Sequence, residues 1–191
     1  MTKNTFIAQS AYPFRMLIFF CSHNLTFILQ VKQIIITFVL QAINNTAMKD
    51  FFRSKCPITS GLDIFGDKWT LVIIKQMLFE EKSTFKDFTD SQEAIATNIL
   101  SSRLKQLETF EIINKNTHPD NKKTKIYTLT DKGLSFTPIL IELMLWSKNN
   151  IHEIHPSMNI HPDLDEIKKH KKQSVKRIIE SYNKFKESLF K

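Results

Sequence analysis

Glycine is scarce in this chain of 191 residues, which has only Gly61, Gly66 and Gly133. These three cannot form a G-x-G-x-x-G turn or a phosphate-binding loop, so dinucleotide-binding and P-loop folds are excluded. The two cysteines, Cys21 and Cys56, are too few for a four-cysteine zinc site or a disulfide framework. The sequence also has no G-x-S-x-G, H-E-x-x-H or paired-carboxylate pattern, so we expect neither an enzyme nor a cofactor.

Acidic residues are absent from residues 1–47, which contain the basic residues Lys3, Arg15 and Lys32. The whole chain carries a formal net charge of +8, which favours an anionic partner. Hydrophobic residues make up 42% of the chain and charged residues 24%, which is enough for a packed core in one domain with extensions. The sharp change of composition predicts a boundary near Met48.

Residues 14–43 are apolar but lack a long uninterrupted hydrophobic run. Arg15, residues 22–24 and Lys32 interrupt them, so the segment falls short of the roughly 20 apolar residues of a membrane-spanning helix. No secretory signal is evident. We interpret residues 1–47 as upstream sequence from a misplaced start, with Met48 as the first residue. The alternatives are an extension that lies on a surface or membrane and a segment that packs on the rest of the protein.

From Cys56 onward the pattern predicts short helices, then a hairpin, then a longer helix. Pro57 suits the first turn of a helix that Gly66 closes, and Asp67 can cap the next helix, which is apolar on nearly every side and therefore central. The helix that Asp67 caps is expected to run through Trp69 to Leu78. The other expected helices cover residues 57–65, 85–90, 97–109 and 131–149, and the expected strands cover 111–117 and 125–130. A helix-turn-helix followed directly by a basic hairpin is a winged helix.

The helix at 97–109 has an apolar stripe and, opposite it, a face without acidic residues. The stripe consists of Leu100, Leu104 and Leu107, at positions i, i+4 and i+7. The opposite face consists of Asn98, Ser101, Ser102 and Lys105. Such side chains suit base edges and phosphates in a major groove, although an ordinary solvated face has the same composition.

The predicted hairpin has a turn-rich, basic tip at residues 118–123. We expect phosphate contacts from its lysines, which would add affinity that depends on salt but little sequence specificity. These lysines are Lys115, Lys122, Lys123 and Lys125.

The C-terminal third predicts a partner subunit and an additional helix. The helix at 131–149 has more apolar surface than one small domain can cover, which favours a second subunit. Residues 151–162 are expected to be a solvated linker, and their histidines, with Asp163, do not have the spacing of a metal site. A helix over 163–191 has an apolar heptad seam that either extends the dimer or packs on the winged helix. The seam consists of Val175, Ile178, Tyr182, Phe185 and Leu189.

These segments resemble the HxlR-type family of bacterial winged-helix transcriptional regulators, which are relatives of the MarR group. The matching stretches lie at residues 56–58 (CPI), 62–69 (LDIFGDKW), 85–88 (FKDF), 99–108 (ILSSRLKQLE), 127–133 (YTLTDKG) and 138–146 (PILIELMLW). The resemblance covers about residues 54–150 and implies a homodimer that binds inverted-repeat operators. The sequence departs from the family at Phe110, where a glycine is usual, and at residues 122–124, where Pro-Pro-Arg is usual.

The resemblance also implies site residues. Contacts to DNA would come from Thr97, Asn98, Ser101, Ser102, Arg103, Lys105 and Lys68, besides the four wing lysines, and the dimer interface would include Leu140, Leu143 and Trp146. Arg103 has an alternative role as an ion-pair partner of Glu108 or a neighbour, and Lys68 has one as a solvated lysine.

Cys56 lies before Pro57, near a helix N-terminus, where the helix dipole stabilises a thiolate. Arg53 and Lys55 add positive charge nearby. In some HxlR-type members the matching cysteine senses oxidants or electrophiles, so Cys56 is a redox-sensing candidate. The alternative is a half-buried structural thiol.

The sequence thus predicts a mainly α fold with a small β wing: a dimeric winged helix-turn-helix domain at 48–150, an N-terminal extension at 1–47, and a linker and C-terminal helix at 151–191. The expected function is sequence-specific transcriptional regulation, with repression as the expected mode, on double-stranded DNA in the cytoplasm. We expect no membrane partner. The alternative is a winged-helix module for protein–protein contact, tethered to a membrane by its N-terminal segment.

Overall fold

The computed structural model describes residues 25–49 and 51–191 of the chain. It divides the chain into two compact units, Met1–Lys55 and Cys56–Lys191. In the first unit, Leu25–Lys49 form helix α2, and seven of its large apolar side chains are exposed: Leu29, Ile34, Ile35, Ile36, Phe38, Val39 and Leu40. Among the helices that the structure describes, none is long and apolar enough to span a bilayer. Our expectations for residues 1–24 lie outside the described residues.

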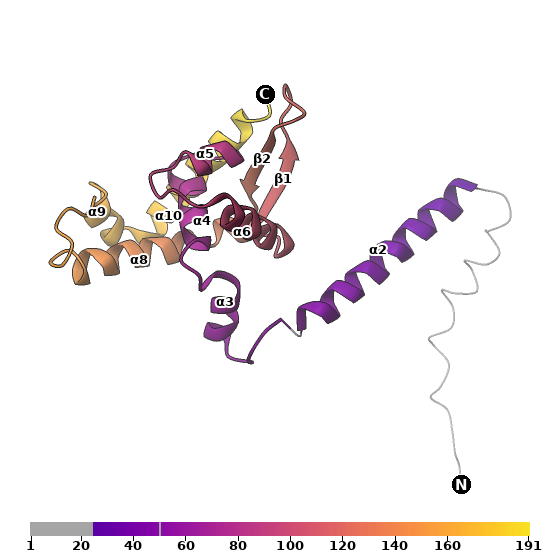
Figure 1. The fold of residues 1–191 in the computed structure, drawn as a ribbon, viewed down its shortest axis with the longest axis horizontal. Helices are drawn as coiled ribbons and strands as arrows, with labels where there is room; N and C mark the ends of the chain where they lie inside the picture. Colours follow the sequence, from indigo (N-terminus) through magenta and orange to yellow (C-terminus); the bar gives the residue numbers. More distant parts are fainter. Residues whose placement is uncertain (1–24, 50) are drawn as a thin grey trace, which may run out of the picture. The chain divides into compact units, whose positions relative to one another are not determined.

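The second unit is a winged helix-turn-helix with a helical tail (Figure 1). Its elements are α3 (Pro57–Phe65), α4 (Thr70–Phe79), α5 (Phe85–Thr89), α6 (Thr97–Thr109), β1 (Ile113–Thr117), β2 (Lys125–Leu129), α7 (Asp131–Leu134), α8 (Thr137–Asn150), α9 (Leu164–Lys169) and α10 (Lys171–Ser188). The predicted mainly α fold with a β wing and a C-terminal helical extension is therefore confirmed.

Helix α4 is the centre of this unit. Ile73, Ile74 and Met77 are fully buried, as the apolar sequence on all its sides predicts. The helix begins at Thr70, and Asp67 lies before it and caps its first N–H groups, as the sequence predicts. One carboxylate oxygen of Asp67, Oδ1, accepts hydrogen bonds from the backbone N–H groups of Trp69 (2.8 Å) and Thr70 (3.1 Å).

The wing is an antiparallel hairpin in which Ile113 pairs with Leu129 at the base and Thr117 pairs with Lys125 near the tip. The outer edge of β2 is also paired at one point, because the backbone N–H of Tyr127 donates to the carbonyl of Ser83 (2.7 Å). At the base, Gly133 lies so close to the Ile112 carbonyl that a Cβ would be 2.3 Å from its oxygen. This contact requires glycine where the wing joins α7.

The single helix predicted over 131–149 is wrong, because the structure has α7 and α8 instead. Pro138 has no N–H to donate to the carbonyl of Leu134 four residues earlier. That carbonyl accepts a hydrogen bond from the Thr137 hydroxyl instead (2.7 Å). Phe110, where the family usually has glycine, has an ordinary φ of −87°, and the next residue, Glu111, takes the left-handed φ of 56°.

The single helix predicted over 163–191 is also wrong. It is interrupted at His170, where φ is −123° and ψ is 43°. The interruption lets the two pieces pack in different places. Leu164 and Ile167 of α9 join Ile141 and Leu145 of α8 in one apolar cluster, whereas α10 continues to α4 and the wing.

The tail packs on the winged helix of its own chain. Val175 and Ile178 of the predicted seam lie against the apolar cluster of α8 and α9, and Tyr182 is 2% exposed. Of the two interpretations of the seam, the structure thus shows packing on the domain.

We predict that a chain beginning at Met48 folds and binds DNA as well as the full chain, because the core described above lies entirely within residues 56–191. Circular dichroism during heating, together with DNA titration of both chains, would check this. A shorter chain that is unfolded or fails to bind would show that residues 1–47 belong to the folded structure.

Candidate nucleic-acid interface

Helices α5 and α6 form the helix-turn-helix, and local hydrogen bonds fix the start of α5. The Thr84 hydroxyl accepts a bond from the backbone N–H of Asp87 (3.2 Å), and the Asp87 carboxylate accepts one from the N–H of Thr84 (2.8 Å). Phe88 on α5 is fully buried. The predicted stripe of α6 is buried as well, with Leu100, Leu104 and Leu107 at most 2% exposed.

The turn between α5 and α6 is attached to the central helix through Glu93. Its carboxylate accepts hydrogen bonds from the ammonium group of Lys75 and from Nε2 of Gln76 (2.6 Å). Burial acts to raise the pKa of Glu93, but these hydrogen bonds outweigh it and hold the pKa below its usual value. Helix α6 therefore starts from a turn that is fixed to the core.

The outer face of α6 is open. Its exposed residues are Thr97, Asn98, Ser101, Ser102 and Lys105. The side-chain oxygen of Asn98 accepts a hydrogen bond from the backbone N–H of Ile99 (2.9 Å), which leaves the NH₂ donors of Asn98 for another acceptor. Acidic residues are absent from 97–107, so this face presents small hydrogen-bonding groups and a cation.

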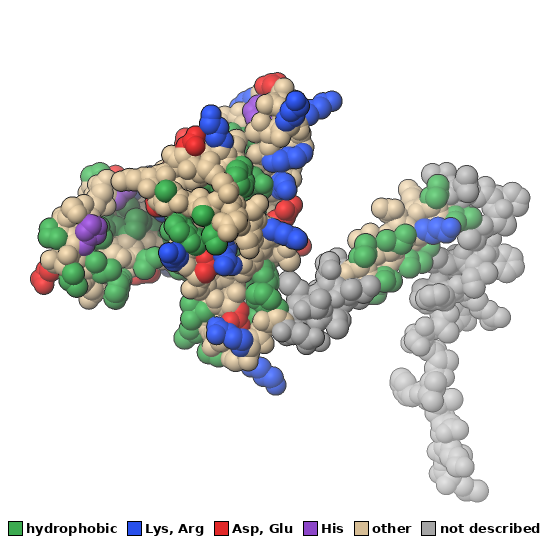
Figure 2. Space-filling view, viewed as in Figure 1, with side chains coloured by type: hydrophobic (Ala, Val, Ile, Leu, Met, Phe, Trp, Pro, Cys, Tyr) green, Lys and Arg blue, Asp and Glu red, His purple; other side chains and the backbone are tan. Residues whose placement is uncertain are grey.

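The wing brings its four lysines to one hairpin, and Figure 2 shows basic side chains along the side of the second unit that carries the wing. Lys122 and Lys123 are exposed at the tip, where Asn121 orders the turn by accepting a hydrogen bond from the N–H of Lys123 (3.1 Å). The ammonium group of Lys115 lies 5.9 Å from the ring centroid of Tyr127. Lys125 donates a hydrogen bond to the Thr117 hydroxyl (2.7 Å).

Arg103 is partly buried and is held by contacts within the protein. Its Nε lies 3.3 Å from Oδ1 of Asp67, and its Nη1 donates to the side-chain oxygen of Gln106 (2.6 Å). The expected ion pair therefore exists, with Asp67 as the partner rather than Glu108. Lys68 is exposed, and its ammonium group lies 5.0 Å from the ring centroid of Trp69.

Two hydrogen bonds that orient α6 are not predicted by the sequence. Nε2 of Gln106 donates to the carbonyl of Ile64 on α3 (3.0 Å), and the ammonium group of Lys132 donates to the carbonyl of Phe110 at the end of α6 (2.8 Å). Both bonds join polar side chains to backbone carbonyls far away in sequence. The positions of Gln106 and Lys132 at helix ends gave no signal that would identify these acceptors.

Helix α8 has two different apolar sides. Leu140 is 4% exposed and belongs to the core of its own chain. The other side is exposed and consists of Ile139, Leu143 and Trp146, at positions i, i+4 and i+7. Leu143 is 45% exposed and Trp146 is 55% exposed. On α3, Ile58 and Leu62 are exposed as well: these five residues are called the α3/α8 apolar surface below.

Cys56 is exposed at the N-terminus of α3, just before Pro57. Hydrogen bonds from the backbone N–H and hydroxyl of Thr59, together with the N–H of Ile58, lower the pKa of Cys56 from its ordinary value. These donors lie in the first turn of α3, in agreement with the effect expected of a helix N-terminus.

In the part of the chain that the structure describes, no three His, Cys, Asp or Glu side chains are grouped so that they could hold a metal ion. This includes the histidines of the loop between α8 and α9.

Residues 64–155 match the protein family described as HxlR-like helix-turn-helix. The HTH-type transcriptional regulator YodB of Bacillus subtilis is 32% identical over 96 residues, which cover 50% of this chain and 85% of YodB. An uncharacterized HTH-type transcriptional regulator of Halalkalibacterium halodurans, BH0655, is 33% identical over 94 residues, covering 49% of this chain and 83% of that protein.

Solved structures match about half of this chain. The reduced form of YodB from B. subtilis has 30% sequence identity and a TM-score of 0.42, and covers 51% of this chain and 95% of that one. The redox regulator HypR in its oxidized form has 27% identity and a TM-score of 0.44, and covers 50% and 97% of the two chains.

The helix-turn-helix, the wing and the sequence matches to the family and to YodB together define a DNA-binding transcriptional regulator, and the chain belongs to the HxlR-type helix-turn-helix family. The family predicted from the sequence is thereby confirmed. Members of this family are regulators rather than enzymes.

Proposed function

We propose that the protein regulates transcription by placing α6 in the major groove of an operator while the wing contacts the adjacent backbone. The observation that carries the proposal is the acid-free, exposed face of α6 beside a wing with four lysines. Bases would be read by Thr97, Asn98, Ser101, Ser102 and Lys105, and phosphates would be held by Lys68, Lys115, Lys122, Lys123 and Lys125. An acidic α6 face would instead have favoured the protein–protein alternative.

Arg103 has a different role in this proposal. Because Asp67 and Gln106 hold its guanidinium group, Arg103 orients α6 through contacts with other residues of the protein. Contact of Arg103 with DNA would use the remaining donors of the same group.

We further propose that two copies associate through the α3/α8 apolar surface and read an inverted repeat. Leu143 and Trp146 are exposed although they are large and apolar, and α9 and α10 already cover the other side of α8. A symmetric dimer buries such a patch against itself and presents two recognition helices to two half-sites. Such a dimer on an operator would exclude RNA polymerase, so we expect repression. We expect the protein to be in the cytoplasm, where its DNA is.

Cys56 would make this regulator responsive to oxidants or electrophiles. Its lowered pKa increases the thiolate fraction near neutral pH, and the thiolate is the reactive form. Ile58 of the α3/α8 apolar surface lies two residues away. A modified thiol would therefore alter the subunit contact and with it the separation of the two recognition helices.

The first prediction from this proposed function concerns the wing. Lys122→Ala combined with Lys123→Ala should weaken binding to all DNA sequences and reduce the slope of log affinity against log salt by about one unit for each lost phosphate contact. Titrations of a DNA duplex at several salt concentrations would measure this. An unchanged slope would contradict the wing assignment.

Two further variants sharpen that measurement. Lys168→Ala combined with Lys172→Ala removes the same charge from the tail and should leave the slope unchanged. Asn98→Ala should reduce discrimination between operator sequences, by about 1–3 kcal/mol if its amide reads a base, without changing the slope.

The second prediction concerns assembly. Trp146→Asp should leave the fold of each subunit intact, because the side chain is 55% exposed, but should prevent dimerisation by burying an unpaired charge in the interface. Operator affinity should fall by about 100-fold or more, since each subunit then holds only a half-site. Sedimentation and DNA titration check both effects.

A charge-matched control for assembly is Ile154→Asp, at a residue that is 84% exposed in the loop after α8. It should remain dimeric. A Trp146→Asp variant that also stays dimeric would rule out the α3/α8 apolar surface as the interface.

The third prediction concerns Cys56, tested in a Cys21→Ser background so that it is the remaining thiol. Alkylation at pH 7 should be faster than that of an unperturbed thiol with a pKa of about 8.5. A quinone or mild oxidant should change operator affinity, and Cys56→Ser should remove this response while preserving reduced-state binding. Slow labelling, or a response that survives Cys56→Ser, would refute the sensor role.

A further inference from the structure

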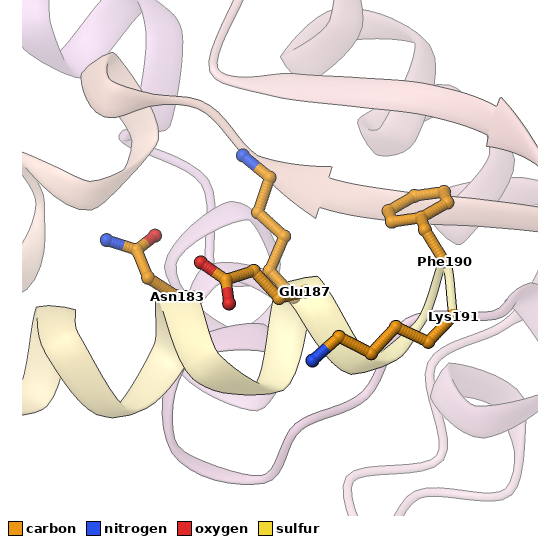
Figure 3. Close-up of a pocket in the computed structure, with 5 residues that line it drawn as sticks. Asn183, Glu187, Phe190 and Lys191 are labelled. Carbon is orange, nitrogen blue, oxygen red and sulfur yellow. The ribbon is translucent and has the colours of Figure 1, made fainter.

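The base of the wing is held by the C-terminal tail through one residue, Leu129. Leu129 is fully buried. The phenolic oxygen of Tyr182 accepts a hydrogen bond from the backbone N–H of Leu129 (2.7 Å), and the ammonium group of Lys186 donates to its carbonyl (3.2 Å). Figure 3 shows the end of α10 beside the wing strand, at an open pocket lined in part by Asn183 and Glu187.

These two contacts give partners to the backbone N–H and carbonyl of Leu129 on the outer edge of β2. Along this strand alternate residues face away from β1, and the outward N–H of Tyr127 already donates to Ser83. Leu129 is the next outward-facing residue, and a buried backbone N–H and carbonyl without partners would cost free energy. Both partners come from α10, which is beyond the 64–155 region that matches the family.

We propose that Tyr182 and Lys186 are positioning residues for DNA binding: they fix the base of the hairpin so that its lysines meet the phosphate backbone while α6 lies in the groove. The proposal rests on the proposed function of the wing. The tail would then be part of the DNA-binding apparatus.

Three features of the structure support this role. Leu129 pairs with Ile113 at the base of the hairpin, so freedom there changes the direction of the whole wing. Beyond this base, Asn114–Thr117 on β1 are exposed, so the hairpin is joined to the core mainly through β2, which is buried from Ile126 to Leu129. Tyr182 is itself packed in the core, with 2% of its surface exposed, and burial raises its pKa to about 12, which keeps the phenol neutral.

Tyr182→Phe is the test variant, because it keeps the ring in the core and removes only the acceptor for the Leu129 N–H. We expect faster amide hydrogen exchange across β1 and β2 in the absence of DNA, with unchanged exchange in α4. Operator affinity should fall about tenfold. In a Lys122→Ala/Lys123→Ala background the same substitution should cause a smaller fall, because the two lysines at the tip of the wing no longer contribute.

Each other outcome decides against the proposal. Unchanged exchange in the wing would show that Tyr182 does not hold it. Faster exchange with unchanged affinity, or an equal fall in both backgrounds, would show a merely structural role. If the wing double variant alone leaves the salt slope unchanged, the proposed function of the wing fails, and the exchange measurement still decides whether the tail holds the hairpin.

Lys186→Met provides a second variant that leaves the tyrosine in place. It should act in the same direction as Tyr182→Phe in both the exchange and the affinity measurement. Lys184→Met is the matched control, since it removes the same charge from an exposed position on the same helix, and it should change neither. Equal effects of the two lysine variants would attribute the result to charge and overturn the role of the Lys186 contact.

Discussion

The carboxylate of Asp67 is the contact on which the arrangement of the DNA-binding unit depends. It caps the central helix α4 and pairs with Arg103 on the recognition helix α6, so one group sets the start of the first helix and the orientation of the second. Burial acts to raise the pKa of Asp67, but hydrogen bonds from Thr70 and Trp69 and the charge of Arg103 lower it overall. The stabilisation is therefore present above the ordinary pKa of an aspartate and is lost as the pH falls through the lowered value.

Much of the architecture could be predicted from the sequence, because periodicity and capping residues act locally. Helices α3 and α6 have the predicted bounds, and the stripe of Leu100, Leu104 and Leu107 is buried as its spacing indicates. The break before α8 could also have been predicted, because Pro138 removes a helical hydrogen bond. The break at His170 could not, since it depends on where α9 and α10 pack.

The candidate site was predictable only in part. The exposed face of α6 and the lysines of the wing follow from helical period and turn residues. The burial of Leu140 and the exposure of Trp146 do not, because the sequence of α8 is apolar on several sides and the docking of the tail decides which side is covered. The partner of Arg103 and the two partners of Leu129 are also products of tertiary structure.

The distance in sequence between Leu129 and its partners has a consequence for biosynthesis. Tyr182 and Lys186 follow Leu129 by 53 and 57 residues, so both are synthesised after the wing and after the whole family domain. Domains fold from the N-terminus as the chain emerges from the ribosome. The helix-turn-helix can therefore assemble on a nascent chain, but the base of its wing is completed only when α10 has been released.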